Sequence, residues 1–180
     1  MHGVRENGRP WRGASLSRAV LAGLAGSLAN SAAIHLAQLT PIPPGTGGLA
    51  KMTLALANHS LTTIGLGSPL PADFSPLGQE IFHTGIGITM ALIYALFVYR
   101  WLKGPGWLRG FIFCQIMWLL QAFVVLPWTG AGLLGLSLSP LTPPLSFALN
   151  AIYGLVLGGV YRTVDAPAAP ARNLPARMNR

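Results

Sequence analysis

Charged side chains are scarce in this sequence, and acidic ones are the scarcest. Lysine, arginine, aspartate and glutamate together make up 9% of the 180 residues, and only four residues are acidic. A soluble domain carries about 25% charged residues. So little charge cannot cover a water-facing surface, and the mean hydropathy of +0.52 agrees with this. The composition therefore argues against an ordinary soluble domain and favours a chain whose solvent is the lipid bilayer.

Other signatures of known chemistry are also missing. The net charge is +8, but the basic residues bracket apolar blocks and form no basic patch of the kind that binds nucleic acid. Cys114 is the one cysteine, which excludes an intrachain disulfide and a cysteine-based metal site. The sequence has no Gly-x-Ser-x-Gly, no phosphate-binding loop and no His-Glu-x-x-His. We therefore predict a protein without enzymatic activity.

Long apolar stretches are what the sequence does contain. Four of them approach the ~20 residues that a helix needs to cross a bilayer, and they cover residues 19–39, 81–98, 110–128 and 145–161. Glycine and proline fill the segments between them, which predicts loops and a tight break at Gly104-Pro105-Gly106. Pro140, Pro143 and Pro144 are expected to stop any helix before the fourth stretch. The predicted fold is an all-α integral membrane protein with four transmembrane helices.

The distribution of lysine and arginine predicts the orientation. Eleven of the twelve basic residues lie in the N-terminal segment 1–18, in the turn 100–109 and in the tail from residue 162 onward, and the other two connections hold only Lys51. The positive-inside rule then places both termini on the cytoplasmic side of a bacterial inner membrane. The tail 163–180 is rich in Ala, Pro and Arg and is expected to be disordered. An alternative is that the first stretch is a cleaved signal peptide.

The first outside connection contains a shorter apolar segment, residues 52–66. Fifteen residues are too few to span a bilayer, so this segment is expected to lie in the interface or to re-enter the membrane. The two halves of the chain also resemble each other, because Arg18-Ala19 and Arg109-Gly110 open the odd stretches while Tyr-Arg pairs close the even ones. This pattern predicts two hairpins of the same orientation.

Small residues recur at helical spacing within the stretches. Ala19, Gly23 and Ser27 form one stripe, and Gly154 and Gly158 form a second. In lipid, small residues let helix backbones approach closely, so these stripes are expected to hold the bundle together or to dock a second membrane protein or a second copy of the chain. Together with the missing catalytic motifs, they make an accessory or structural partner of a membrane complex the leading hypothesis.

One group of polar residues has side chains suited to binding a metal ion or a haem. His35 lies near the end of the first stretch, and Glu80 and His83 lie at the start of the second, so the three residues are predicted to share a depth near the outer face. Glu80 and His83 are three apart and share a helix face. Two histidines and a carboxylate suit iron, manganese or zinc, and His35 with His83 could instead offer imidazoles to a haem. The plainer alternative is an ion pair in interfacial water.

Polar amides within the stretches supply a third hypothesis. Amides in lipid usually hydrogen-bond between helices. Asn30, Gln115 and Asn150 would have to line a polar cavity if the protein carried a small solute or a lipid. Three functions therefore stay open from the residues: an accessory partner, a haem- or metal-binding redox subunit, and a carrier.

Several motifs together resemble a family of small four-helix bacterial inner-membrane proteins that includes YagU. The resemblance covers most of residues 18–162 and lies in Ala22-Gly23-Leu24-Ala25-Gly26, His83 with Gly85 and Gly87, Tyr94-Ala95, Gly106-Trp107-Leu108-Arg109-Gly110, Leu126-Pro127 and Tyr153-Gly154-Leu155-Val156-Leu157-Gly158. It implies a four-helix bundle in the inner membrane and brings no settled activity with it. Asn150 stands where members often carry a histidine, so no histidine-based site is carried over.

Overall fold

The computed structural model describes residues 13–39, 48–67, 70–71, 73–128 and 130–165, and all regular structure in these ranges is helical. In chain order the elements are α1 (Gly13–Gln38), α2 (Gly48–Thr63), α3 (Pro76–Ile93), the π-helical turn η1 (Tyr94–Val98), α4 (Gly106–Leu120), the π-helical turn η2 (Gln121–Val125), α5 (Leu126–Trp128), the 3₁₀ turn η3 (Leu133–Gly135) and α6 (Thr142–Asp165).

Four helical segments in the described part of the chain are long and apolar enough to cross a membrane. They cover Leu16–Ala37, Pro76–Val98, Gly106–Trp128 and Thr142–Thr163. At 1.5 Å per residue, the two 23-residue segments reach about 35 Å, which exceeds the ~30 Å of a hydrocarbon core. The predictions of an all-helical fold and of four apolar helices able to span a membrane are confirmed.

All four spanning helices begin earlier than the sequence predicted. Ser75 caps α3, since its Oγ accepts a hydrogen bond from the backbone N–H of Gly78 (3.2 Å), and Pro76 occupies the first turn. The expectation that prolines stop any helix before the fourth stretch is wrong for Pro143 and Pro144, because α6 begins at Thr142 and includes both, whereas Pro140 lies before the helix. A first-turn proline is tolerated because the N–H that it lacks would have no partner within the helix.

The terminal segments are only partly described. Residues 13–18 belong to α1, and residues 163–165 belong to α6, so the helices extend into both segments that were predicted to lie outside the membrane domain. The predicted disorder of the tail was wrong for residues 163–165, and its remainder, 166–180, lies outside the described residues, as do residues 1–12.

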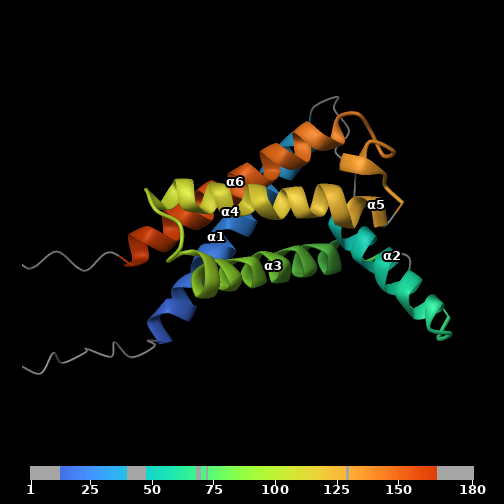
Figure 1. Ribbon diagram of the computed structural model, residues 1–180, viewed down its shortest axis with the longest axis horizontal. Helices are drawn as coiled ribbons and strands as arrows, with labels where there is room; N and C mark the ends of the chain where they lie inside the picture. The colour runs from blue at the N-terminus through green and yellow to red at the C-terminus, as the bar shows by residue number, and fades with distance from the viewer. Residues whose placement is uncertain (1–12, 40–47, 68–69, 72, 129, 166–180) are drawn as a thin grey trace, which may run out of the picture.

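The four spanning helices pack in the order α3, α1, α6, α4. The helix α1 contacts both α3 and α6, and α6 contacts α4, whereas α4 meets the α3 segment mainly at η1. The shorter α2 leaves the bundle obliquely at the end where α3 begins (Figure 1). The predicted break between the second and third spans is confirmed, with Gly104 at φ +111° and Pro105 directly before α4.

Glycines bring α4 and α6 into backbone contact. A Cβ placed on Gly110 would overlap the carbonyl oxygen of Gly154 and lie 2.6 Å from the backbone nitrogen of Gly158. A Cβ on Gly154 would lie 2.6 Å from the carbonyl oxygen of Gly110. Because real Cβ atoms do not approach other atoms so closely, only glycine lets these helices reach this separation. This Gly-x-x-x-Gly pair acts within the chain.

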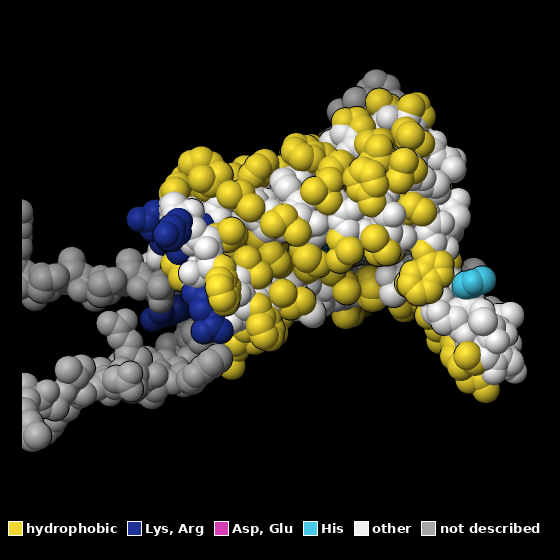
Figure 2. Space-filling model, in the orientation of Figure 1, with side chains coloured by type: hydrophobic (Ala, Val, Ile, Leu, Met, Phe, Trp, Pro, Cys, Tyr) yellow, Lys and Arg dark blue, Asp and Glu magenta, His cyan; other side chains and the backbone are white. Residues whose placement is uncertain are grey.

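Lysine and arginine side chains gather at one end of the bundle, while the body is largely apolar (Figure 2). This end is formed by the start of α1, the turn between η1 and α4, and the end of α6. Arg109 holds the turn, since its Nε donates to the carbonyl oxygen of Gly104 (2.8 Å) and its guanidinium lies 4.9 Å from the Tyr99 ring centroid. The bundle therefore has one basic end and one end without described lysine or arginine side chains.

Candidate functional site

The predicted cluster of His35, Glu80 and His83 lies at the end of the bundle opposite the arginines, between α1 and α3. Glu80 accepts a hydrogen bond from the hydroxyl of Ser31, with 2.9 Å between Ser31 Oγ and Glu80 Oε2. The second carboxylate oxygen lies 3.9 Å from His35 Nε2. These side chains are 66% exposed for His35 and 50% exposed for Glu80. The outermost layer of the α1–α3 contact is thus polar and open to the surroundings.

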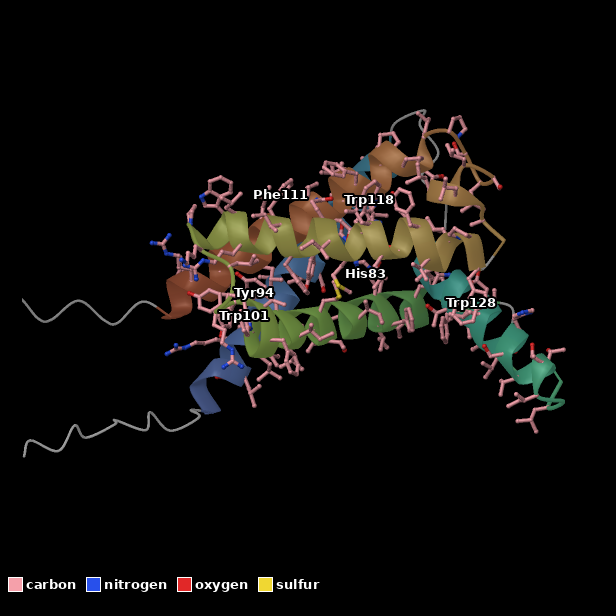
Figure 3. All side chains as sticks on the ribbon, in the orientation of Figure 1. His83, Tyr94, Trp101, Phe111, Trp118 and Trp128 are labelled. Atoms are coloured by element: carbon pink, nitrogen blue, oxygen red, sulfur yellow. The ribbon has the colours of Figure 1, made fainter. Side chains whose placement is uncertain are left out.

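His83 lies one helical turn further along α3 and points toward the other helices (Figure 3). Its Nε2 lies 3.3 Å from Nδ2 of Asn30 on α1. The imidazole ring has a donor and an acceptor nitrogen when it is neutral, so an amide N–H can bond to its unprotonated nitrogen. The side-chain oxygen of Asn30 is buried and has no hydrogen-bond partner among the described residues. Asn30 and His83 form a second polar layer.

A third layer lies where α1, α3 and α6 meet. The Tyr153 hydroxyl on α6 donates a hydrogen bond to the carbonyl oxygen of Gly87 on α3. The same tyrosine ring rests on α1, since a Cβ on Gly26 would lie 2.8 Å from Tyr153 Cε2. Ser27 packs against Gly87, is 2% exposed, and its Oγ has no partner among the described residues. Tyr153 therefore connects three helices through one ring and one hydrogen bond.

Sequence reasoning missed the role of Tyr153. Asn150 is its polar neighbour at helical spacing on α6, but the residues that receive the Tyr153 ring and hydroxyl are two glycines on other helices, Gly26 and Gly87. A large aromatic side chain with a hydroxyl within an apolar span, opposite small-residue stripes, is the signal that points to such a contact.

The three predicted metal ligands are not gathered around one point. His35 approaches Glu80, whereas His83 pairs with Asn30. No group of three His, Cys, Asp or Glu side chains within the described ranges is placed to hold a metal ion. Metal or haem binding by His35, Glu80 and His83 stays a prediction from spacing.

The amides that were predicted to line a carrier cavity lie on three helices and do not form one described hydrogen-bonded group. Asn30 pairs with His83, and Asn150 donates to the carbonyl oxygen of Ser146 within α6 (2.9 Å). Both polar atoms of the Gln115 amide on α4 are buried without a described partner. Near it, Trp118 Nε1 donates to the hydroxyl of Ser146 (2.9 Å) and ties α4 to α6.

At the basic end, a π-helical turn gathers aromatic rings. Residues five apart lie about 140° apart around an α-helix, but about 50° apart where the turn widens. The bond from the Tyr99 N–H to the Tyr94 carbonyl oxygen (2.7 Å) marks this widening. It brings both tyrosines to the bundle interior, where Tyr94, Tyr99 and Tyr161 pack edge to face. This end of the bundle is closed by ring packing.

The outward face of α3 carries a shallow groove. Its volume is about 430 Å³, and it is lined by Glu80, Ile81, Thr84, Gly85 and Ile88. A Cβ on Gly85 would meet no atom within 4 Å. Of the four spanning segments, the one that contains α3 is the least covered, with 17% of an apolar 18-residue stretch buried against 28% for each of the others.

Comparisons with protein-family models, with curated proteins and with solved structures find no match for this chain. The resemblance to the YagU-containing family accordingly stays a prediction from the motifs.

Proposed function

We propose that this chain is a non-enzymatic inner-membrane protein that acts as an accessory partner of another membrane protein, and that the groove on α3 receives a transmembrane helix of that partner. The observation that carries the proposal is the contrast between glycines. The glycines at the helix contacts, such as Gly23 and Gly110, are covered within the chain. A Cβ on Gly85 or Gly159 would meet no atom within 4 Å, and of these two it is Gly85 that lines a described groove.

The chemistry of the groove favours a helix with a polar residue over a lipid tail. Helices in lipid associate where small residues permit close approach and where polar side chains find partners. Gly85 supplies the close approach, and the half-exposed Glu80 carboxylate supplies a charge that a hydrocarbon chain cannot satisfy. A partner helix with a lysine, an arginine or a hydroxyl at the depth of Glu80 fits this surface.

The membrane arrangement belongs to the same proposal. The basic end of the bundle faces the cytoplasm, and the Glu80 end faces outward, in accordance with the positive-inside rule. The pairs α1–α3 and α4–α6 then form two hairpins with both termini inside. We assign α2 to the outer interface and not to a re-entrant position, because it leads away from the spans (Figure 1) and its polar residues Ser60, Thr62 and Thr63 are exposed.

Site-specific photocrosslinking in native membranes tests the proposal. A benzoylphenylalanine at Ile81, in the groove, should give one discrete protein adduct, and the matched probe at Leu155 on α6, which is also exposed, should give none. Filling the groove by Gly85→Leu should abolish the adduct without changing the amount of folded protein. An adduct of twice the chain mass would replace the partner by a second copy, and equal adducts at both positions would refute the proposal.

A further inference from the structure

The contact between α1 and α3 changes character halfway along its length. From the Glu80 end it presents Ser31 with Glu80, then Asn30 with His83, then Ser27 packed against Gly87. We call these three layers the polar seam. Beyond Ser27 the contacts are apolar, with Ala19, Ala22 and Ala91 all fully buried. Ser27 lies near the middle of the spanning segment Leu16–Ala37.

Two atoms at the inner end of the seam have no hydrogen-bond partner in the described protein, the Ser27 hydroxyl oxygen and the Asn30 side-chain oxygen. Burying such atoms in lipid without a partner is costly, because no solvent is there to bond to them. They lie one turn apart on the same helix and on the side that faces α3. Small buried polar sites of this kind normally hold ordered water, which makes two to four hydrogen bonds.

We propose that the polar seam is a water-accessible half-channel that opens at the Glu80 end of the bundle and ends at Ser27, and that water is its ligand. The exposed Glu80 and His35 side chains form the entrance, where they attract water. Asn30 and His83 line the middle, and Ser27 binds the innermost water. The Tyr153 ring and the alanines below it close the path. This inference does not depend on the partner helix proposed above.

The half-channel connects the seam to the aqueous phase on one side of the membrane only. His83 exchanges protons with the aqueous phase at the Glu80 end and is separated from the opposite phase by the apolar half of the contact and the tyrosine rings. The same holds for either orientation of the bundle in the membrane.

Single cysteines report water access directly, since a thiol reacts as the thiolate, which forms only in contact with water. The background is Cys114→Ser, which removes the only native thiol. In sealed membranes, a small membrane-impermeant ammonium methanethiosulfonate should modify Ser27→Cys at least about tenfold faster than Leu28→Cys. Leu28 is the next residue on α1 and is 71% exposed on the outside of the bundle, so it is the matched lipid-facing control. Ala91→Cys, beyond the end of the seam, should be as slow as Leu28→Cys.

Reaction should occur from one face of the membrane only. The reagent is added from each side of the membrane in turn. Modification of Ser27→Cys from the face opposite the predicted one refutes the orientation in the proposed function but supports the half-channel. Modification from both faces would mean a continuous pore and would overturn the proposal. Photocrosslinking at Ile81 is a separate readout, so failure of either proposal is visible without the other.

A seam can be too narrow for the reagent without being dry. A second measurement, made on the chain with its native seam, therefore detects water directly. With ¹⁵N-histidine, solid-state NMR follows the transfer of magnetisation from water to each ring, and His83→Gln identifies the signal of His83. The His83 ring should receive magnetisation within about a factor of two of the exposed His35 ring. Slow thiols at Ser27 together with a His83 ring that receives none would overturn the half-channel, and transfer to His83 with slow thiols would support a single-file seam.

Discussion

The α4–α6 contact and the α1–α3 contact both depend on glycine, yet they place different atoms at the point of closest approach. Between α4 and α6, Gly110 faces backbone atoms of Gly154 and Gly158. Between α1 and α3, Gly87 faces the Ser27 hydroxyl and the Tyr153 ring. The first contact is stabilised by backbone packing along the half that lies nearer the basic end, whereas the second carries polar layers to an exposed carboxylate at the opposite end. Small residues thus permit a close backbone contact between α4 and α6 and a polar seam between α1 and α3.

The largest expected effect comes from breaking the backbone contact. Gly110→Ala should lower the free energy of unfolding by about 3 kcal/mol, because the added methyl group can only be accommodated by moving α6 away. Gly159→Ala on α6 is the control, since its Cβ meets nothing within 4 Å, and helix propensity should make it neutral or stabilising by up to about 1 kcal/mol. Unfolding of the purified chain by SDS titration, followed by circular dichroism, measures both. Equal values for the two variants would contradict the α4–α6 geometry.

A smaller loss is expected at the polar contact. Gly87→Ala should lower the free energy of unfolding by about 2 kcal/mol, because its Cβ would overlap the Ser27 hydroxyl, which has some freedom to rotate. Gly85→Ala, two residues earlier on the open face of α3, should leave the same SDS midpoint unchanged or raise it. If Gly85→Ala destabilised the isolated chain more than Gly87→Ala, the faces of α3 would be assigned the wrong way round.

The smallest effect tests single hydroxyl groups. Tyr153→Phe removes the hydrogen bond to the Gly87 carbonyl and should cost about 1 kcal/mol. Tyr94→Phe removes a buried hydroxyl that has no described partner, so it should be neutral or slightly stabilising. The difference between the two variants in the same titration isolates the hydrogen bond from the loss of a tyrosine. A loss of stability in Tyr94→Phe that matches the loss in Tyr153→Phe would refute the special role of Tyr153.

Helix ends show how far sequence patterns reach. The four spans were predicted because apolar runs of this length have no other stable solvent, and all four helices are present. Their starts were placed too late, since hydropathy marks where apolar residues begin, whereas α3 begins at a capped Ser75-Pro76 and α6 begins before two first-turn prolines. Capping depends on local hydrogen bonds, which an average over many residues does not record.

The candidate site shows the same limit. The depth of His35, Glu80 and His83 followed from their distances to the helix ends, and the structure does bring His35 to Glu80. The partner of His83 could not be predicted, because helical spacing gives the face of α3 but not the rotation of α1 that brings Asn30 to it. The placement of Tyr153 likewise required two glycines on different helices to be aligned in space.

The sequence by itself determined that the chain is helical, that four segments are apolar enough to span a bilayer, and that small residues would mediate helix contacts. These properties follow from composition and from the 3.6-residue period, which act locally. Only the tertiary structure decided which glycines are covered and which stay open, and that α1 packs between α3 and α6. It also decided that the polar side chains of α1 and α3 meet in three layers. Those outcomes depend on the rotation and crossing of each helix against its neighbours, and no single helix carries that information in its own sequence.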